Sequence, residues 1–196
     1  RFSIYKLKVS GNVEEDKKFI TAVNNIIRDN KEKYMLRLDG NQGFTEKTFV
    51  QFTDFIIKKD IAIQVFEQPL KKDDYAGLRE IKKYSPAPVI LDETIFTPED
   101  ARRSIDNNLC DGINIKLAKS GLSESMKIMK IAKKHKLKLM IGCMTETMTG
   151  LSASIYMAAG TDAFDYIDLD SVYFFYHSNV YKNIKIGGNG YTISRT

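Results

Sequence analysis

The sequence has little of what metal clusters, disulfide frameworks and membrane spans require. It contains 2 cysteines and 2 histidines in 196 residues. Cys110 and Cys143 stand in apolar stretches without the spacing of zinc ligands, which is typical of a reducing, cytoplasmic compartment. No apolar run approaches the roughly 18 residues of a membrane span. No signal peptide is visible either, so we expect no membrane partner. Because the chain opens at Arg1 rather than at Met, we expect further sequence upstream.

Charge of one sign is in only modest excess. The 30 Lys and Arg residues face 25 Asp and Glu residues, which gives a net charge of +5 and a pI near 9.0. The lysines are dispersed over predicted helices, as at Lys58-Lys59 and Lys133-Lys134. Solvated helix faces explain this pattern better than a nucleic-acid surface, so we expect no nucleic-acid partner. The 43% hydrophobic and 28% charged residues are typical of one large globular domain or two small ones.

Short apolar runs alternate with segments of helical periodicity along the chain. Helix starts are indicated by Thr45, by Thr97-Pro98 and by Ser123, because threonine, serine and proline suit the first turn of a helix. No hairpin signal separates the runs, so we expect parallel βαβ units. The predicted strands are Tyr5–Val9, Met35–Leu38, Ile61–Phe66, Val89–Leu91, Ile113–Leu117, Leu137–Ile141 and Tyr166–Leu169.

A residue that could do chemistry stands at the C-terminal end of each run, at intervals of about 24 to 31 residues. An open doubly wound sheet would gather such residues at one switch point, whereas a closed (β/α) barrel brings every strand end to one mouth. The spacing therefore predicts an α/β fold of the barrel type. A complete barrel has eight strands in about 250 residues. We count seven, so we expect the first strand to be absent from residues 1–196. The residues concerned are Lys8, Asp39, Glu67, Asp92, Lys116, the Cys143/Thr145 pair and the Asp168/Asp170 pair.

Asp39, Glu67 and Asp92 follow three consecutive predicted strands and are expected to converge at the mouth of the barrel. Three buried carboxylates repel one another unless a cation lies between them. Mg²⁺ prefers carboxylate oxygens and water, and the lack of histidine at the strand ends argues against zinc. Spacing alone leaves an equal alternative, a structural network in which the acids pair with lysines or with Arg37.

Lys8 and Lys116 are expected on opposite sides of the acids, and Lys6 shares the strand face of Lys8. A lysine near other cations or in a dry pocket can have its pKa lowered toward neutrality and act as a general base. One lysine on each side of a metal-bound carboxylate substrate suits the removal of an α-proton from one face and its return to the other. The alternative is that these are ordinary surface lysines in a lysine-rich chain.

Five motifs occur in order at barrel spacing. They are Lys6-Leu7-Lys8, Leu36-Arg37-Leu38-Asp39-Gly40-Asn41-Gln42-Gly43, Phe66-Glu67-Gln68-Pro69, Leu91-Asp92-Glu93-Thr94 and Asn114-Ile115-Lys116-Leu117. With them, the chain resembles the barrel domain of the enolase superfamily, in its muconate-lactonizing-enzyme subgroup, from Lys6 to about Gly188. The stretch 142–147 and the pair Asp168 and Asp170 are similar to the dipeptide epimerases of that subgroup.

The resemblance implies a fold and an activity. The fold is a (β/α)7β barrel, of which residues 1–196 would form an incomplete C-terminal catalytic domain without the N-terminal α+β capping domain of the family. The activity is a 1,1-proton transfer at the α-carbon of the C-terminal residue of a dipeptide, through an enediolate stabilised by Mg²⁺. We also expect a homo-oligomer.

The resemblance implies roles for individual residues as well. Asp39, Glu67 and Asp92 would bind Mg²⁺, and Lys8 and Lys116 would be the opposed acid and base. The implied substrate contacts are Lys6 with the substrate carboxylate, Asp168 and Asp170 with the α-ammonium group, and Cys143 and Thr145 in the lining of the pocket.

Two other activities and one non-catalytic function compete with the epimerase. o-Succinylbenzoate synthase and muconate cycloisomerase share the lysines and the acids. Their substrates carry no α-ammonium group, so Asp168 and Asp170 argue against both. The alternative for that pair is helix capping or solvation of a loop. A barrel that binds a metal or a ligand without catalysis would be expected to have lost a base, and both lysines are present.

Overall fold

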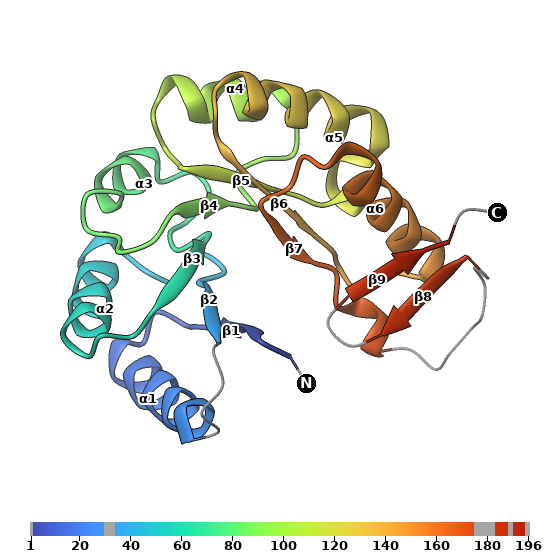
Figure 1. Cartoon of the computed structure of the whole chain (residues 1–196). Coiled ribbons are helices and arrows are strands. Elements are labelled where there is room, and N and C mark those ends of the chain that lie inside the picture. Colours follow the sequence, from blue (N-terminus) through green and yellow to red (C-terminus); the bar gives the residue numbers. More distant parts are fainter. Residues whose placement is uncertain (1, 30–33, 175–182, 188–189, 195–196) are drawn as a thin grey trace.

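The computed structural model describes residues 2–29, 34–174, 183–187 and 190–194 (Figure 1). In this part of the chain, seven parallel strands form one sheet in which neighbours in sequence are also neighbours in space. The predicted strands are confirmed, with bounds that differ by at most two residues. The strands are β1 (Ile4–Lys8), β2 (Met35–Asp39), β3 (Ile63–Glu67), β4 (Val89–Leu91), β5 (Gly112–Ile115), β6 (Lys138–Gly142) and β7 (Tyr166–Asp168).

Helices follow the strands and lie around the outside of the sheet (Figure 1). The predicted starts at Thr45 and Thr97 are confirmed. Each threonine side chain accepts a hydrogen bond from the backbone N–H three residues on, and the side chain at that position accepts one from the threonine N–H. Such reciprocal bonds satisfy donors that the start of a helix leaves unpaired. The helices are α1 (Val13–Asp29), α2 (Glu46–Lys58), α3 (Tyr75–Ile81), α4 (Pro98–Asp106), α5 (Leu117–Lys134), α6 (Met148–Thr161) and the 3-10 helix η1 (Ser171–Phe174).

The helix start predicted at Ser123 lies two residues after a break at Gly121, where the second of two helical segments of α5 begins, whereas α5 as a whole begins at Leu117. Gly121 interrupts α5 with φ 69° and ψ 169°, a conformation that glycine adopts without the steric cost of a side chain. The apolar periodicity visible in the sequence begins only beyond this break. The first turn of α5 therefore lies next to the end of β5, and it carries Lys119.

Contacts between early and late strands show that the sheet curls. One apolar cluster inside the curve draws a residue from each of β3, β4, β6 and β7. The guanidinium carbon of Arg37 on β2 lies 5.3 Å from the ring centroid of Tyr166 on β7, and its Nη1 donates to the Ile167 carbonyl at 2.8 Å. In a flat sheet these two strands would be five strand spacings, roughly 24 Å, apart. The prediction of a barrel-type sheet, rather than an open doubly wound one, is therefore confirmed.

The main apolar core lies between the outer face of the sheet and the helices. Next to α2 and β3, four buried aromatic rings have centroids 5.1–6.4 Å apart. Burial of a side chain of this size stabilises a fold by about 1.5–3 kcal/mol. The cluster fixes β3 just before Glu67. The rings belong to Phe44, Phe49, Phe52 and Phe66.

A hairpin outside the barrel sheet was not expected. β8 (Ile184–Gly187) and β9 (Gly190–Ile193) pair antiparallel, and the Tyr191 hydroxyl on β9 donates to the Leu169 carbonyl after β7. The sequence Gly-Gly-Asn-Gly at 187–190 is a turn signal that predicts such a hairpin. The seven barrel strands pair only in parallel within the described residues, so the hairpin does not alter the barrel assignment.

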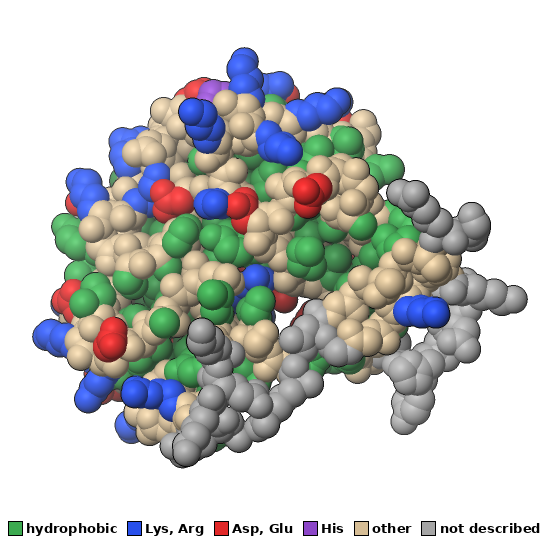
Figure 2. All heavy atoms as spheres, viewed as in Figure 1, with side chains coloured by type: hydrophobic (Ala, Val, Ile, Leu, Met, Phe, Trp, Pro, Cys, Tyr) green, Lys and Arg blue, Asp and Glu red, His purple; other side chains and the backbone are tan. Residues whose placement is uncertain are grey.

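Two surface properties bear on the predicted partners. Among the described helices, none combines the length and the apolar character that a bilayer-crossing segment requires. On the face that Figure 2 shows, lysine and arginine side chains are spread around the periphery of the molecule rather than gathered in one patch. This distribution agrees with solvated helix faces.

Candidate active site

The alternation of side chains along a strand decides which residues face the interior. On β3, Phe66 packs into the outer core, whereas Val65 lies in the inner cluster and Glu67 contacts the interior lysines. On β2, Leu38 packs outward and Asp39 points inward. Two-residue periodicity therefore carries the residues identified in the sequence into the interior of the curve.

The three predicted acids are buried side by side at the carboxyl ends of neighbouring strands. Asp39 ends β2 and stands opposite Glu67, which ends β3, and Asp92 directly follows β4. Their exposed fractions are 0%, 1% and 2%. Because isolated carboxylates are costly to bury so completely, each needs a cationic or hydrogen-bonding partner.

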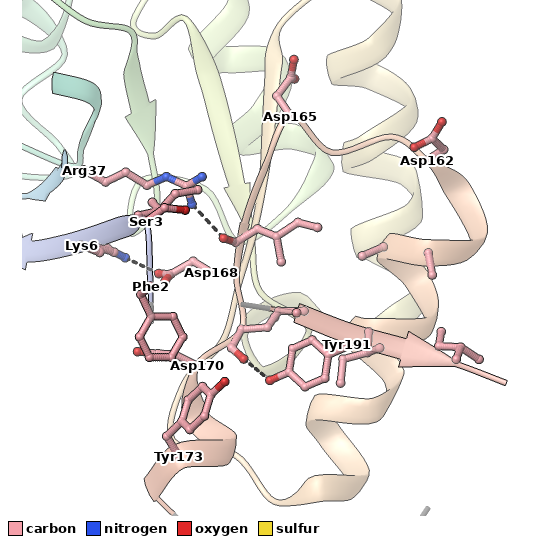
Figure 3. A pocket seen from close by; sticks show the side chains of 18 residues that line it. Phe2, Ser3, Lys6, Arg37, Asp162, Asp165, Asp168, Asp170, Tyr173 and Tyr191 are labelled. Carbon is pink, nitrogen blue, oxygen red and sulfur yellow. Dashed lines mark hydrogen bonds and ion pairs between the residues drawn. The ribbon is translucent and has the colours of Figure 1, made fainter. Parts of the chain in front are cut away.

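Lys6 on β1 lies among these acids. Its ammonium nitrogen is 3.1 Å from Asp39 Oδ2, 2.6 Å from Glu67 Oε2 and 2.8 Å from Asp168 Oδ2. Figure 3 shows the last contact, in which Lys6 meets an acid of β7. Burial opposes the charged amine, but the three carboxylate charges outweigh it and raise the pKa of Lys6. Lys6 is therefore a cation in the middle of the site.

The two predicted bases stand at opposite ends of the row of acids. Lys8 Nζ is 2.8 Å from Asp39 Oδ2, and its side chain is 65% exposed. Lys116 Nζ is 2.5 Å from Asp92 Oδ2 and 4.0 Å from Glu67 Oε1, and its side chain is 10% exposed. Burial disfavours the charged amine, but Asp92 and Glu67 together outweigh burial and raise the pKa of Lys116. The lowered pKa expected for a lysine base is thus not found at Lys116 while Asp92 is its partner.

Lys119 is a buried lysine that the sequence patterns do not identify. Because α5 begins directly after Lys116, the side chain of Lys119 lies one helical turn further on and also contacts the carboxylate of Asp92. Its Nζ donates to Asp92 Oδ1, to the Asp92 carbonyl at 2.6 Å and to the Asn114 carbonyl at 3.2 Å. Burial outweighs the attraction of Asp92 and lowers the pKa of Lys119. The signal was available: a second lysine three residues after Lys116, at a helix start.

Asn114 is a second residue that was missed. It precedes Lys116 by two positions on β5, so strand alternation predicts that both side chains face inward. Its Nδ2 donates to Glu67 Oε1 at 2.8 Å, and the residue is 1% exposed.

The structural network in which the acids pair with lysines or with Arg37 is found in part. Lysines bind the acids, whereas Arg37 donates to the neutral Gln64 Oε1 and to the Ile167 carbonyl.

Burial and charge balance differently at the three acids. Burial raises the pKa of Glu67 to about 7, against the opposing charge of Lys6, and the charges of Asp39 and Asp92 add to the increase. Burial acts on Asp39 and Asp92 as well, but the lysines beside them outweigh it and hold both pKa values below the usual range. Glu67, in the middle of the row, is the acid whose negative charge is least compensated.

The acids supply the oxygen donors that Mg²⁺ takes in proteins. Among the described residues, no three His, Cys, Asp or Glu side chains lie together as ligands of one ion, and lysine ammonium groups bridge the acids instead. The predicted convergence on one point is therefore not seen in this lysine-paired arrangement. The donor set nevertheless fits a hard cation. Glu67 Oε2 is buried with Lys6 Nζ as its cationic neighbour at 2.6 Å, and Asp39 and Asp92 are close enough to raise the pKa of Glu67.

The residues expected to contact a dipeptide lie at the ends of β6 and β7. Cys143 and Thr145 follow β6 in a loop, so strand alternation does not apply to them. Cys143 Sγ is 3.5 Å from the Asp168 carbonyl and 3.7 Å from Asp170 Oδ1. Thr145 is exposed. The side chain of Asp168 is 18% exposed and engaged by an ammonium group, whereas Asp170 is exposed at the rim.

A cleft of about 600 Å³ opens between β1, β7 and the hairpin (Figure 3). Aromatic side chains of Phe2, Tyr173 and Tyr191 line it. Lys6 and Asp168 belong to the same lining, so the cleft reaches the acids from the side of β7.

A curled parallel sheet with acids and lysines at the carboxyl ends of its strands defines a barrel protein whose chemistry lies at that end. The family model described as Enolase C-terminal domain-like matches residues 1–191, and the chain belongs to this family. The resemblance noted from the sequence motifs is thereby confirmed.

Several characterised relatives are similar to this chain. The L-Ala-D/L-Glu epimerase of Thermotoga maritima is 40% identical over 170 residues, which cover 87% of this chain and 48% of that protein. The substrate-liganded L-Ala-D/L-Glu epimerase of Bacillus subtilis superposes with a TM-score of 0.88 at 30% identity, covering 98% of this chain and 54% of that one. The dipeptide epimerase of Enterococcus faecalis, complexed with Mg and L-Leu-L-Tyr, superposes with a TM-score of 0.82 at 32% identity, covering 88% and 48%. The chain spans about half the length of the relatives that it matches.

Proposed function

We propose that this chain carries the active site of a Mg²⁺-dependent dipeptide epimerase, an isomerase that moves one proton at the α-carbon of the C-terminal residue of a dipeptide. The observation that carries the proposal is the row of buried acids with Lys8 at one end and Lys116 at the other. An amine on each side of a bound substrate suits removal of a proton from one face and delivery to the other. The names of the relatives, and the dipeptide in the Enterococcus faecalis structure, support the same substrate class.

Asp39, Glu67 and Asp92 are the residues that we propose hold Mg²⁺. When bound there, Mg²⁺ would supply positive charge beside the substrate carboxylate and make the adjacent C–H more acidic. The fit rests on three buried carboxylates on adjacent strands and on the raised pKa of Glu67, to which Asp39 and Asp92 contribute. Lys6, whose ammonium group lies among the acids, would bind the substrate carboxylate.

The two lysines would exchange roles with the direction of the reaction. One neutral amine takes the α-proton from its face of the substrate, and the opposite ammonium group delivers a proton to the other face, which inverts the configuration. Burial of Lys116 favours its neutral form once the charge of Asp92 is engaged elsewhere. Lys8 is open to solvent, and Asp39 and Asn41 orient its ammonium group at 2.8 and 2.6 Å.

Asp168 and Asp170 are the acids that we propose bind the α-ammonium group of the dipeptide, with Cys143 and Thr145 in the lining of the pocket. Two acids at the end of one strand suit a cationic group. The substrates of o-succinylbenzoate synthase and muconate cycloisomerase carry no such group. The acids therefore favour the epimerase over both.

The proposal extends to the compartment, the domain organisation and the oligomeric state of the protein. Both cysteines are free thiols, which supports a reducing compartment such as the cytoplasm. The length of the relatives supports a role for residues 1–196 as the catalytic barrel part of a protein that also has a capping domain. The homo-oligomer stays a prediction.

Uptake of deuterium from solvent tests the proposed function. The full-length protein, incubated in D₂O with L-Ala-L-Glu or with dipeptides that have an apolar second residue, should exchange the α-proton of the C-terminal residue and form the other diastereomer, only when Mg²⁺ is present. Turnover of the cyclohexadiene carboxylate substrate of o-succinylbenzoate synthase alone would contradict the epimerase. A lack of exchange in every dipeptide, with binding retained, would indicate a non-catalytic barrel.

Removing the rim acid should affect substrate binding rather than metal binding. We expect Asp170→Asn to raise the Michaelis constant for dipeptides about 10- to 100-fold, because it removes one charge facing the α-ammonium group. Mg²⁺ affinity should change less than twofold, and N-acetylated dipeptides should be poor substrates of the unaltered protein. Asp162→Asn is the matched control, since Asp162 lies in the same cleft but at the end of α6. Equal effects of the two variants would contradict the assignment.

A further inference from the structure

Gln68 follows Glu67 directly and belongs to a quoted motif to which the proposed function gives no role. Its exposed fraction is 0%, and its φ of 32° lies in the left-handed region that residues other than glycine rarely adopt. Such a conformation is strained and persists where the surroundings determine it. Contacts with neighbouring residues must therefore hold Gln68 in this conformation.

The side-chain amide of Gln68 joins the end of β3 to the end of β4. Its Oε1 accepts from the backbone N–H of Asp92 at 2.9 Å and of Thr94 at 3.2 Å. Its Nε2 donates to the Leu70 carbonyl at 3.0 Å and to the Thr94 hydroxyl at 2.9 Å. Both donors and both acceptor positions of the amide are thus used. One of these bonds ends on the backbone of Asp92 itself.

The backbone of Gln68 joins the same strand end to both neighbours. Its N–H donates to the Ile90 carbonyl of β4 at 2.9 Å, and its carbonyl accepts from Gln42, in the loop after β2, at 2.8 Å. That loop touches Gln68 at Gly40 as well, where an added Cβ would lie 3.2 Å from the Gln68 carbonyl oxygen. Gln68 is thus hydrogen-bonded to the loop that follows Asp39 and to the segment that contains Asp92, and it is covalently joined to Glu67.

We infer that Gln68 is a positioning residue, which holds the ends of β2, β3 and β4 at the spacing that lets Asp39, Glu67 and Asp92 bind one divalent cation together. The inference rests on the proposed function. Lysine ammonium groups compensate part of the charge of the three acids, and a neutral cross-link between the backbones fixes the spacing of the strand ends without adding a further charge. A glutamine can form such a cross-link, because it both donates and accepts without adding charge.

Mg²⁺ titration by calorimetry of the full-length protein tests the inference. Gln68→Met keeps the length of the side chain and removes all hydrogen bonds of the amide. We expect it to weaken Mg²⁺ binding at least tenfold. At saturating Mg²⁺, kcat should fall while the KM for a dipeptide changes less than threefold, because Gln68 makes no proposed contact with the substrate. A role in folding alone would not split kcat from KM in this way.

Thr94→Val and Ile56→Val complete the test. Thr94→Val removes the hydroxyl partner of the amide and leaves Gln68 intact, so it should weaken Mg²⁺ binding in the same direction by a smaller factor, and it carries the test if Gln68→Met does not fold. Ile56→Val opens a small cavity in the core next to α2, away from the acids, and should leave Mg²⁺ affinity within twofold. Unchanged Mg²⁺ affinity in folded Gln68→Met would overturn the inference. If that variant does not fold, unchanged Mg²⁺ affinity in Thr94→Val would overturn it. An equal loss of Mg²⁺ affinity in Ile56→Val would overturn it as well. Absence of Mg²⁺ binding by the unaltered protein would instead overturn the proposed function.

Discussion

Replacing either lysine at the ends of the acid row should abolish epimerisation by the full-length protein. We expect Lys8→Ala and Lys116→Ala each to lower the rate of diastereomer formation by about 10³-fold or more, because each removes the group that takes or delivers one of the two protons. The remaining lysine still faces one side of the substrate. Each variant should therefore exchange the α-proton of one diastereomer with solvent, and the two variants should differ in which diastereomer they exchange.

Mass spectrometry and NMR in D₂O separate exchange from epimerisation in this experiment. Lys138→Ala is the control, since Lys138 stands at the opposite end of β6 and pairs with Asp165 at 2.7 Å. It should retain at least half of the activity. If both active-site variants exchanged the same diastereomer, or if either epimerised at the rate of the unaltered protein, the two-base mechanism would be wrong.

Glu67 should make the metal-free protein less stable as the pH rises from about 4.5 to 7. Its pKa is 4.5 in the reference state and is raised to about 7 in the folded state by burial, with Asp39 and Asp92 adding to the increase. Between these values the folded protein binds more protons than the unfolded chain, so the free energy of unfolding falls as pH rises. The shift corresponds to about 3 kcal/mol. Asp39 and Asp92 have lowered pKa values, so their contributions are lost only as pH falls below about 3.8, outside this window.

Urea unfolding in EDTA at several pH values measures this effect. Glu67→Gln should remove most of the decline, so that its free energy of unfolding at pH 8 exceeds that of the unaltered protein, and it should weaken Mg²⁺ binding by at least 100-fold. Glu99→Gln on the exposed face of α4 is the control and should leave the pH profile unchanged. Saturating Mg²⁺ should stabilise the unaltered protein more at pH 8 than at pH 6, because it competes with the proton on Glu67. A decline that persists in Glu67→Gln would show that another group causes it.

The inward positions could be predicted because strand periodicity is local. Asp39 and Glu67 are each preceded by an outward apolar residue, Leu38 and Phe66, and both pairs are found as predicted. The helix starts at Thr45 and Thr97 were equally predictable, since a capping box needs only four consecutive residues. These features depend on interactions between residues that are close together in the sequence, so they can be predicted from it directly.

Partners that come from other strands could not be predicted in the same way. The contacts of Lys6 with acids of β2, β3 and β7 were not predicted, because these acids are brought together only when the sheet curls. Lys119 reaches Asp92 because α5 begins six residues before the predicted start, at Leu117. The raised pKa of Lys116 likewise follows from the 2.5 Å contact with Asp92, which no spacing in the sequence contains.

The positions of the strands along the chain, the inward alternation and the residue types at each strand end could be predicted, because they depend on short-range periodicity and on the chemistry of individual side chains. Which lysine neutralises which acid depends on the tertiary structure. Coulomb energy varies with distance and burial, and both are set by the curvature of the sheet and by the packing of its helices. The central position of Glu67, between Asp39 and Asp92 and beside Lys6, is the clearest result of that packing, and it is the reason that this one carboxylate is left with the least compensated charge.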